Sequence, residues 1–347
     1  MRIHKQALWR LRFSGCVVRY GVRKSTRKIN MPLHLFHRIK NSANWMLSPL
    51  GFAIERTRKR KWLWPNSILE IKVGRYVIKT PGMNPVFWYY QENPGFVGQL
   101  GVLTTLVHEK YPQAGVIDIG ANVGDTACII KTAADVPLLC VEGDEISFKF
   151  LQKNIAQMPN TTAHKLFLAE KTDTISGSLA CVGWNTTILP GSEKSDKAIK
   201  VVRFDEFITT QPGWENYKLL KIDTEGFDCP ILRGSTQFIR QVLPVIFFEY
   251  NLKSMQLIGE TGLDTLFMLG ELGYSHIAFH DSGGRFIGST KLADRETVKD
   301  WHDYASGKNS QIYYMDITVF HERDADLAEK YLAHERQQRL APKPKTQ

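Results

Sequence analysis

Val116-Ile-Asp-Ile-Gly-Ala-Asn-Val-Gly-Asp125 is the stretch of sequence that decides the fold. The apolar run that ends at Ile119 is typical of a buried strand, and the glycines after it indicate a tight turn into a helix. Gly120 lets the backbone approach a ligand closely, and Gly124 removes a side chain where the helix begins. Such a turn at the carboxyl end of a strand predicts a nucleotide site in an open α/β sheet.

The polar residues of this turn distinguish between nucleotide ligands. A dinucleotide fingerprint, G-x-G-x-x-G, needs glycine at its middle and sixth positions, which are Asn122 and Asp125 here. The Asp125 carboxylate would repel a pyrophosphate, whereas Asp118 is suited to accept a hydrogen bond from the ammonium of a methionine moiety. The turn therefore favours S-adenosylmethionine (SAM) over NAD, and an NAD-dependent dehydrogenase is the disfavoured alternative. The expected cofactor-binding residues of this segment are Asp118, Gly120, Ala121, Asn122, Gly124 and Asp125.

Strands and helices alternate from this motif onward, which predicts a mostly parallel sheet with helices on both faces. Seven strands are expected, at residues 115–119, 136–141, 164–168, 219–222, 244–249, 275–279 and 312–320. A strand-rich excursion at 175–204 interrupts them. The predicted organisation is a basic N-terminal extension, a hairpin and aromatic lead-in, a Rossmann-like α/β domain, and a C-terminal helix with a tail, at residues 1–67, 68–112, 113–322 and 323–347 respectively.

Acidic side chains follow three of the expected strands. Glu142 ends the second strand, where a carboxylate commonly receives a ribose diol, although an ordinary helix-start acid is the alternative. Asp223 and Glu225 follow the apolar run Leu219-Leu-Lys-Ile222, and Glu249 ends the next strand. Carboxylates that converge from neighbouring strand ends are costly unless they bind a cation, hydrogen-bond to a ligand or take up protons. We therefore expect these acids to serve the chemistry of the site.

These segments, in this order and spacing, resemble the FkbM-type methyltransferase family. The resemblance covers about residues 85–320, and Arg203-Phe-Asp-Glu-Phe207 is a looser match because Arg203-Phe204 replaces the usual leucine approach. It implies a class I, Rossmann-like methyltransferase that O-methylates hydroxyls of sugars, glycolipids, polysaccharides or natural products. The matching residues are Val116-Ile-Asp-Ile-Gly-Ala-Asn-Val-Gly-Asp-Thr126, Leu220-Lys-Ile-Asp-Thr-Glu-Gly226, Leu232-Arg-Gly234 and Val245-Ile-Phe-Phe-Glu249.

Methyl transfer to an alcohol needs the acceptor oxygen, methyl and sulfur in line, and a base or metal to remove the hydroxyl proton. We expect Asp223 to orient or deprotonate the acceptor, with Glu225 or Glu249 assisting. A Mg²⁺ site formed by Asp223 and Glu249 with Asn251 is an alternative. The sequence offers no fixed ligand spacing for it, so no metal is predicted.

The basic charge of the chain is concentrated at its N-terminus. Residues 1–61 hold 16 Lys or Arg and one acid, Glu55, whereas the whole chain has a net charge of +10, so the remainder is negative. Basic and aromatic residues within 32–64 suit either contact with anionic lipid headgroups or a solvated helix packed on the body. Two rival functions use this segment: a nucleic-acid methyltransferase with a basic arm, and a non-catalytic membrane-surface adaptor with a methyltransferase-like body. The arm shows no recognisable RNA-binding module, which disfavours nucleic acid as a partner.

The five cysteines are odd in number and form no CxxC pair, which suits a reducing compartment. The sequence also lacks a stretch of about 18 apolar residues that would span a bilayer. We expect a cytoplasmic protein, with peripheral membrane contact through residues 32–64 as an option.

Overall fold

The computed structural model describes residues 8–13, 16–20, 54–57, 67–82, 84–93, 95–182, 185–190, 198–306, 312 and 314–340. The chain divides into two units, Met1–Ser67 and Ile68–Gln347. In the first unit, β1 (Leu8–Phe13) pairs antiparallel with both β2 (Cys16–Tyr20) and β3 (Ile54–Thr57). The basic amphipathic segment at 32–48 lies outside the described residues.

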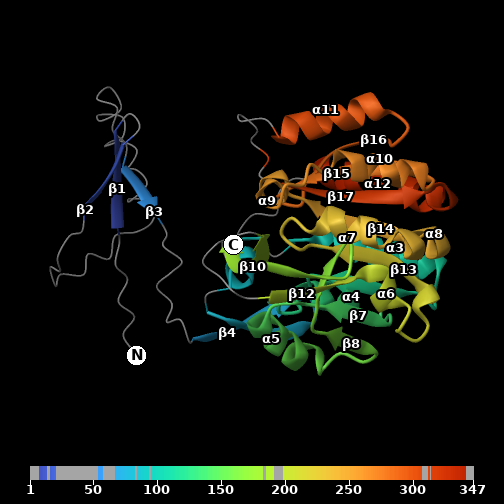
Figure 1. Ribbon diagram of the computed structural model, residues 1–347, viewed down its shortest axis with the longest axis horizontal. Helices are drawn as coiled ribbons and strands as arrows, with labels where there is room; N and C mark the ends of the chain where they lie inside the picture. The colour runs from blue at the N-terminus through green and yellow to red at the C-terminus, as the bar shows by residue number, and fades with distance from the viewer. Residues whose placement is uncertain are drawn as a thin grey trace. The chain divides into compact units, whose positions relative to one another are not determined.

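An eight-stranded sheet in the order β16-β15-β17-β14-β13-β6-β7-β8 forms the centre of the second unit (Figure 1). The five strands from β8 to β14 run parallel, and the remaining three pair antiparallel. The Rossmann-like α/β fold is therefore confirmed, and β16 is an edge strand beyond the seven that the sequence predicted. The strands are β6 (Gly115–Ile119), β7 (Leu138–Val141), β8 (Thr161–His164), β13 (Tyr217–Ile222), β14 (Val245–Tyr250), β15 (Tyr274–Asp281), β16 (Phe286–Lys291) and β17 (Met315–His321).

The prediction of the third strand at residues 164–168 is wrong. The third strand of the sheet is β8, whose sequence Thr-Thr-Ala-His is largely polar and whose side chains are half-buried or exposed at the sheet edge. The apolar residues Phe167–Ala169 instead form β9, which pairs with β12 (Ala198–Arg203) in a separate sheet. The prediction placed the strand where the residues are apolar. An edge strand is only partly buried, so its sequence can be largely polar, as that of β8 is.

Two layers of helices cover the sheet. The first layer, with its own apolar core, consists of α2 (Val86–Glu92), α3 (Gly98–Lys110), α4 (Asp125–Ala133), α5 (Glu145–Ile155) and α12 (Ala325–Leu340). The second consists of α6 (Phe204–Ile208), α7 (Asp228–Gly234), α8 (Thr236–Val242), α9 (Leu252–Leu257), α10 (Leu263–Glu271) and α11 (Arg295–Ser306). Successive strand residues alternate between the cores, as Leu219 and Leu220 do, because strand side chains point to opposite faces. Within the described ranges, no helix has the length and apolar character needed to cross a bilayer.

The excursion at 175–204 is strand-rich, as predicted. It contains β10 (Asp173–Val182), β11 (Asn185–Pro190) and β12, in a four-stranded sheet of order β11-β10-β12-β9. The hairpin that precedes the main domain is also present, as β4 (Ile68–Val73) and β5 (Tyr76–Pro81).

Candidate cofactor and acceptor site

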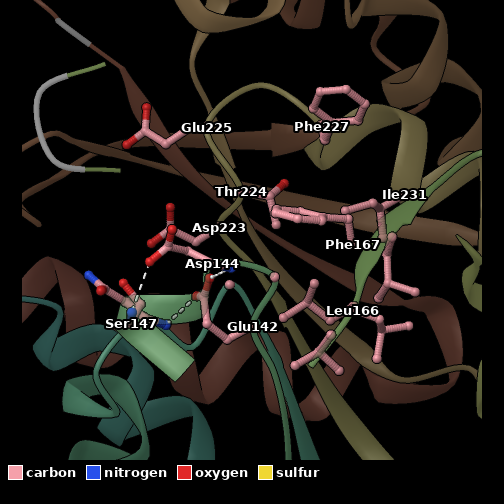
Figure 2. A pocket seen from close by; sticks show the side chains of 16 residues that line it. Glu142, Asp144, Ser147, Leu166, Phe167, Asp223, Thr224, Glu225, Phe227 and Ile231 are labelled. Atoms are coloured by element: carbon pink, nitrogen blue, oxygen red, sulfur yellow. Dashed lines mark hydrogen bonds between the residues drawn. The ribbon is translucent and has the colours of Figure 1, made fainter. Parts of the chain in front are cut away.

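A cavity opens at the carboxyl edge of the parallel strands (Figure 2). Its lining comes from the turn after β6, the residues after β7 and the residues after β13, together with residues 166–168. Five of the predicted site residues line it: Gly120, Asn122, Glu142, Asp223 and Glu225. Residues that are up to 105 positions apart in the sequence thus meet where the topology of an open α/β sheet places a ligand.

The turn after β6 depends on glycine for a steric reason. Gly120 has φ +74°, and a Cβ added to it would lie 1.8 Å from the carbonyl oxygen of Asp223. Only glycine therefore lets the turn pass against the end of β13. Gly124 has φ +92° and immediately precedes α4, whereas Ala121 is fully buried and does not line the cavity.

Glu142 is held in place by two backbone amides. The N–H of Asn122 donates to Oε2 over 2.8 Å, and the N–H of Asp144 donates to Oε1 over 2.7 Å. A carboxylate has about four lone-pair sites, so each oxygen retains capacity for a ligand hydroxyl. Burial raises the pKa of Glu142 to about 7, against the effect of these two amides. This geometry suits the predicted contact with a ribose diol.

Asp118 lies below the turn instead of in the cavity. Its side chain is 0% exposed, its Oδ1 is 2.9 Å from Nζ of Lys221, and its Oδ2 accepts a hydrogen bond of 2.6 Å from the Thr126 hydroxyl. Lys221 also donates to the carbonyl oxygen of Gly120 over 3.0 Å. The carboxylate predicted to receive the cofactor ammonium is therefore engaged by the protein, and in this structure it fixes the turn from beneath.

The three acids predicted to serve the chemistry, Asp223, Glu225 and Glu249, differ in their exposure and in their contacts. The side chain of Asp223 is 42% exposed and lies 3.8 Å from the Lys221 ammonium. The surrounding protein restricts hydration of the partly exposed carboxyl and so raises the pKa of Asp223, and Lys221 opposes this shift. Glu225 has φ +53° and accepts a hydrogen bond of 3.3 Å from the Ser254 hydroxyl. Glu249, by contrast, is 5% exposed and lies beside the cavity without lining it.

Asp125 is a buried residue at the start of α4, and the lead-in segment reaches it. The Tyr90 hydroxyl donates to Oδ2 of Asp125 over 3.3 Å, and burial raises the pKa of Asp125 to about 6. In the same segment, Nδ2 of Asn84 donates to Oδ1 of Asn122 over 3.0 Å. The lead-in therefore supports the cofactor turn through two buried polar side chains.

Sequence reasoning missed three residues that shape this site: Lys221, Asp228 and Asn84. Asp228 accepts from the backbone N–H groups of Thr224 and Gly226 at 3.1 Å each, and so fixes the turn that carries the acids. Burial, and then the Asp223 carboxylate, raise the pKa of Asp228 to about 7. The sequence did contain a signal for Lys221, because a lysine inside the apolar run 219–222 is unusual. It contained no such signal for Asn84.

The cavity has the features that a SAM molecule would need. Leu166, Phe167 and Phe227 supply apolar surface suited to an adenine ring, and Glu142 supplies the acceptor for its ribose. Thr224 also lines the cavity, and its buried hydroxyl has no hydrogen-bond partner among the described residues. A buried hydroxyl without a partner is costly, so its presence indicates a polar group on a ligand. Among the residues that the structure describes, no cluster of three or more His, Cys, Asp or Glu side chains is arranged to hold a metal ion.

The sheet order, with this cavity at the carboxyl edge, defines a Rossmann-like class I methyltransferase fold. Residues 118–275 match the model of the Methyltransferase FkbM domain family. The resemblance predicted from the motifs is thereby confirmed for residues 118–275.

Several known proteins are similar to this chain. The hexuronic acid methyltransferase AglP of Haloferax volcanii is 27% identical over 150 residues, which are 43% of this chain and 61% of that protein. The solved methyltransferase FkbM from Methylobacillus flagellatus KT is 15% identical over 60% of this chain and 44% of that chain, with a TM-score of 0.35. P. horikoshii TYW2 in complex with MeSAdo is 14% identical over 84% of this chain and 86% of that chain, with a TM-score of 0.37. The matched stretch spans less than two thirds of AglP and of the FkbM structure.

Proposed function

We propose that this protein is a SAM-dependent O-methyltransferase whose acceptor is a hydroxyl of a sugar, glycolipid, polysaccharide or natural product. The observation that carries the proposal is the convergence of Glu142, the Gly120 turn and Asp223 on one cavity. Glu142 lies at the strand end where an acid commonly binds a ribose, and Asp223 lines the same cavity, where it could accept a proton from the acceptor. The similarity to AglP supports a sugar as the acceptor.

Bound SAM supplies an electrophilic methyl group on a positively charged sulfur. Asp223 orients the acceptor hydroxyl and takes its proton as the oxygen–carbon bond forms and the sulfur–carbon bond breaks, with the bonding electron pair left on sulfur. The raised pKa of Asp223 suits this role, because a carboxyl with a higher pKa is a stronger base once it is ionised. Glu225, on the same turn, is placed to hold the acceptor.

Methyl transfer by wild type and Asp223→Asn tests the proposal. The full chain is incubated with SAM labelled in its methyl group and with glycan, lipid and small-molecule fractions of the source cell, and labelled products are identified by mass spectrometry. We expect the wild type to label a hydroxyl-bearing product and Asp223→Asn to be slower by about 100-fold or more, the range for loss of a general base. Affinity for S-adenosylhomocysteine (SAH) should stay within about twofold of wild type, since the substitution removes only a proton acceptor.

Asp303→Asn is the matched control, because Asp303 is an exposed acid on α11 that pairs with Lys299. It should transfer methyl groups at the wild-type rate. Equal rates for wild type and Asp223→Asn would exclude Asp223 as the base, and a labelled nitrogen or carbon in place of oxygen would exclude O-methylation.

A further inference from the structure

The cavity at the carboxyl edge of the sheet has an apolar side and an acidic side. Figure 2 shows Leu166 and Ile231 on one side of it, and Asp223 and Glu225 on the other. Four of the residues that line it are acids: Glu142, Asp144, Asp223 and Glu225. Carboxylates that are grouped in a cleft attract a cation more strongly than the same carboxylates would on an open surface. This arrangement therefore suits a ligand that joins an apolar ring to a positively charged group.

The buried ammonium of Lys221 offsets only part of this negative charge. It lies 2.9 Å from Oδ1 of Asp118 and 3.8 Å from Oδ2 of Asp223. Asp118 lies below the turn, whereas the side chain of Asp223 lines the cavity and is 42% exposed. One positive charge shared between two carboxylates leaves the three groups together negative, and the nearer carboxylate takes the larger share of the attraction. Asp223 therefore keeps the capacity to attract a cationic group of a ligand.

The proposed methyl transfer changes the charge at two positions in this site. The acceptor hydroxyl gives its proton to Asp223 as the oxygen–carbon bond forms, and the sulfur–carbon bond breaks with its electron pair left on sulfur. A positively charged sulfonium thus becomes a neutral thioether, while the Asp223 carboxylate becomes a neutral carboxyl. The base and the methyl group meet at the same acceptor oxygen, so the two charges attract each other at short range before transfer, and both are gone after it.

We propose that the cavity distinguishes SAM from its product SAH by charge, and that Asp223 is the residue that determines this preference. SAM and SAH share the adenine, the ribose and the amino acid, so Glu142 and the apolar side chains contribute equally to the binding of both. The sulfonium adds an attraction that SAH lacks, so SAM binds more tightly and the product leaves readily after transfer. This inference rests on the proposed function and adds to it a weak inhibition by the product.

The affinities of SAM and SAH for the full-length wild type, each measured by calorimetry, test the preference. At pH 8 the Glu142 carboxyl, whose pKa burial raises to about 7, is mostly ionised in both titrations. We expect the Kd of SAH to exceed that of SAM at least about fivefold, the effect of one attraction between charges in a partly hydrated site. Equal affinities, or tighter binding of SAH, overturn this inference and leave the proposed function intact. If neither compound binds, the proposed function is overturned and this inference with it.

Asp223→Asn separates the effect of the charge from that of the methyl group, because SAM and SAH differ in both. Asparagine has nearly the size and shape of aspartate but carries no charge. SAM affinity should fall about fivefold in this variant, whereas SAH affinity should stay within about twofold of wild type. A merely structural role of Asp223 would weaken the binding of the two compounds to the same extent. Equal losses for SAM and SAH, or an unchanged SAM affinity in the folded variant, overturn the assignment of Asp223.

Two further variants show whether the preference belongs to Asp223 or to the acidic side as a whole. Asp144 caps α5 by accepting from the N–H groups of Ile146 and Ser147 over 3.0 and 2.9 Å, and asparagine caps a helix as well as aspartate does. Asp144→Asn should therefore stay folded and reduce the ratio of the two Kd values less than Asp223→Asn does. An equal or larger reduction overturns Asp223 as the determinant. Asp303→Asn, on exposed α11, is the control and should change neither affinity.

Discussion

The ammonium of Lys221 lies 2.9 Å from the Asp118 carboxylate, and the two side chains are 1% and 0% exposed. This ion pair joins the neighbouring strands β6 and β13 below the cavity, and Lys221 also binds the carbonyl oxygen of Gly120. The glycine turn and the acids after β13 are therefore fixed by one buried cation. Burial opposes its charge, but the nearby carboxylates of Asp118 and Asp223 more than offset this and raise the pKa of Lys221.

Lys221→Met should destabilise the fold strongly. The substitution keeps an unbranched, apolar side chain but leaves the buried Asp118 carboxylate without its cation, and breaking a buried pair in this way typically costs about 3–5 kcal/mol. Urea denaturation at pH 7 measures the change in the free energy of unfolding. Lys218→Met on the same strand is the control. Among the described residues, Lys218 donates a hydrogen bond to the carbonyl oxygen of Val242, and its loss should cost about 1 kcal/mol. Equal losses in the two variants would contradict the role of the pair.

SAH affinity should depend on pH through Glu142. Burial raises the pKa of this carboxyl to about 7, and only its ionised form can accept hydrogen bonds at both oxygens. The ionised fraction rises about tenfold between pH 6 and pH 8, so wild-type affinity should rise by about the same factor, as measured by calorimetry. Glu142→Gln should bind more weakly and lose this dependence. Glu145→Gln should retain it, because its exposed lysine partners lower the pKa of Glu145 to about 2. A flat wild-type profile would argue against ribose binding by Glu142.

Asp125 should make the fold less stable as the pH rises. Its pKa is raised to about 6 in the folded chain by burial, so the folded state binds a proton more tightly than the unfolded state does. The stability contributed by that proton is present at low pH and is lost as the pH passes 6. Between pH 5 and pH 7.5, the free energy of unfolding of Asp125→Asn should therefore gain about 1 kcal/mol relative to wild type. Parallel curves for the two proteins would show that Asp125 titrates normally.

The lead-in segment should contribute to cofactor affinity although it lies outside residues 118–275. Asn84→Ala removes the hydrogen bond to Asn122 and should weaken SAH binding about 3- to 10-fold, the worth of about 1 kcal/mol. Gln157→Ala also removes a hydrogen bond to the hairpin, from the segment after α5 to the carbonyl oxygen of Val77, and the other hydrogen bond of the Gln157 side chain goes to Asn154. Its SAH affinity should be unchanged. If both variants bind SAH like wild type, the lead-in only packs against the domain.

Much of this site could be predicted because local pattern determines it. The apolar run before Gly120 and the acids after β7 and β13 are signals that lie within a few residues of each other. Lys221 and Asp118 show where such reasoning ends. Whether a buried carboxylate faces a ligand or a lysine depends on the partner from a neighbouring strand, more than 100 residues away, and spacing along the chain does not encode it. The membrane contact expected for residues 32–64 falls largely outside the described residues and stays a prediction.

Calorimetric titration of SAM into the full-length wild type and Glu142→Ala is the most direct test of the central claim. The account predicts one SAM per chain for the wild type, and an affinity at least tenfold weaker for Glu142→Ala at pH 8, with the same free energy of unfolding to within about 1 kcal/mol. Absence of SAM binding by the folded wild type, or equal affinity in the two proteins, would contradict it.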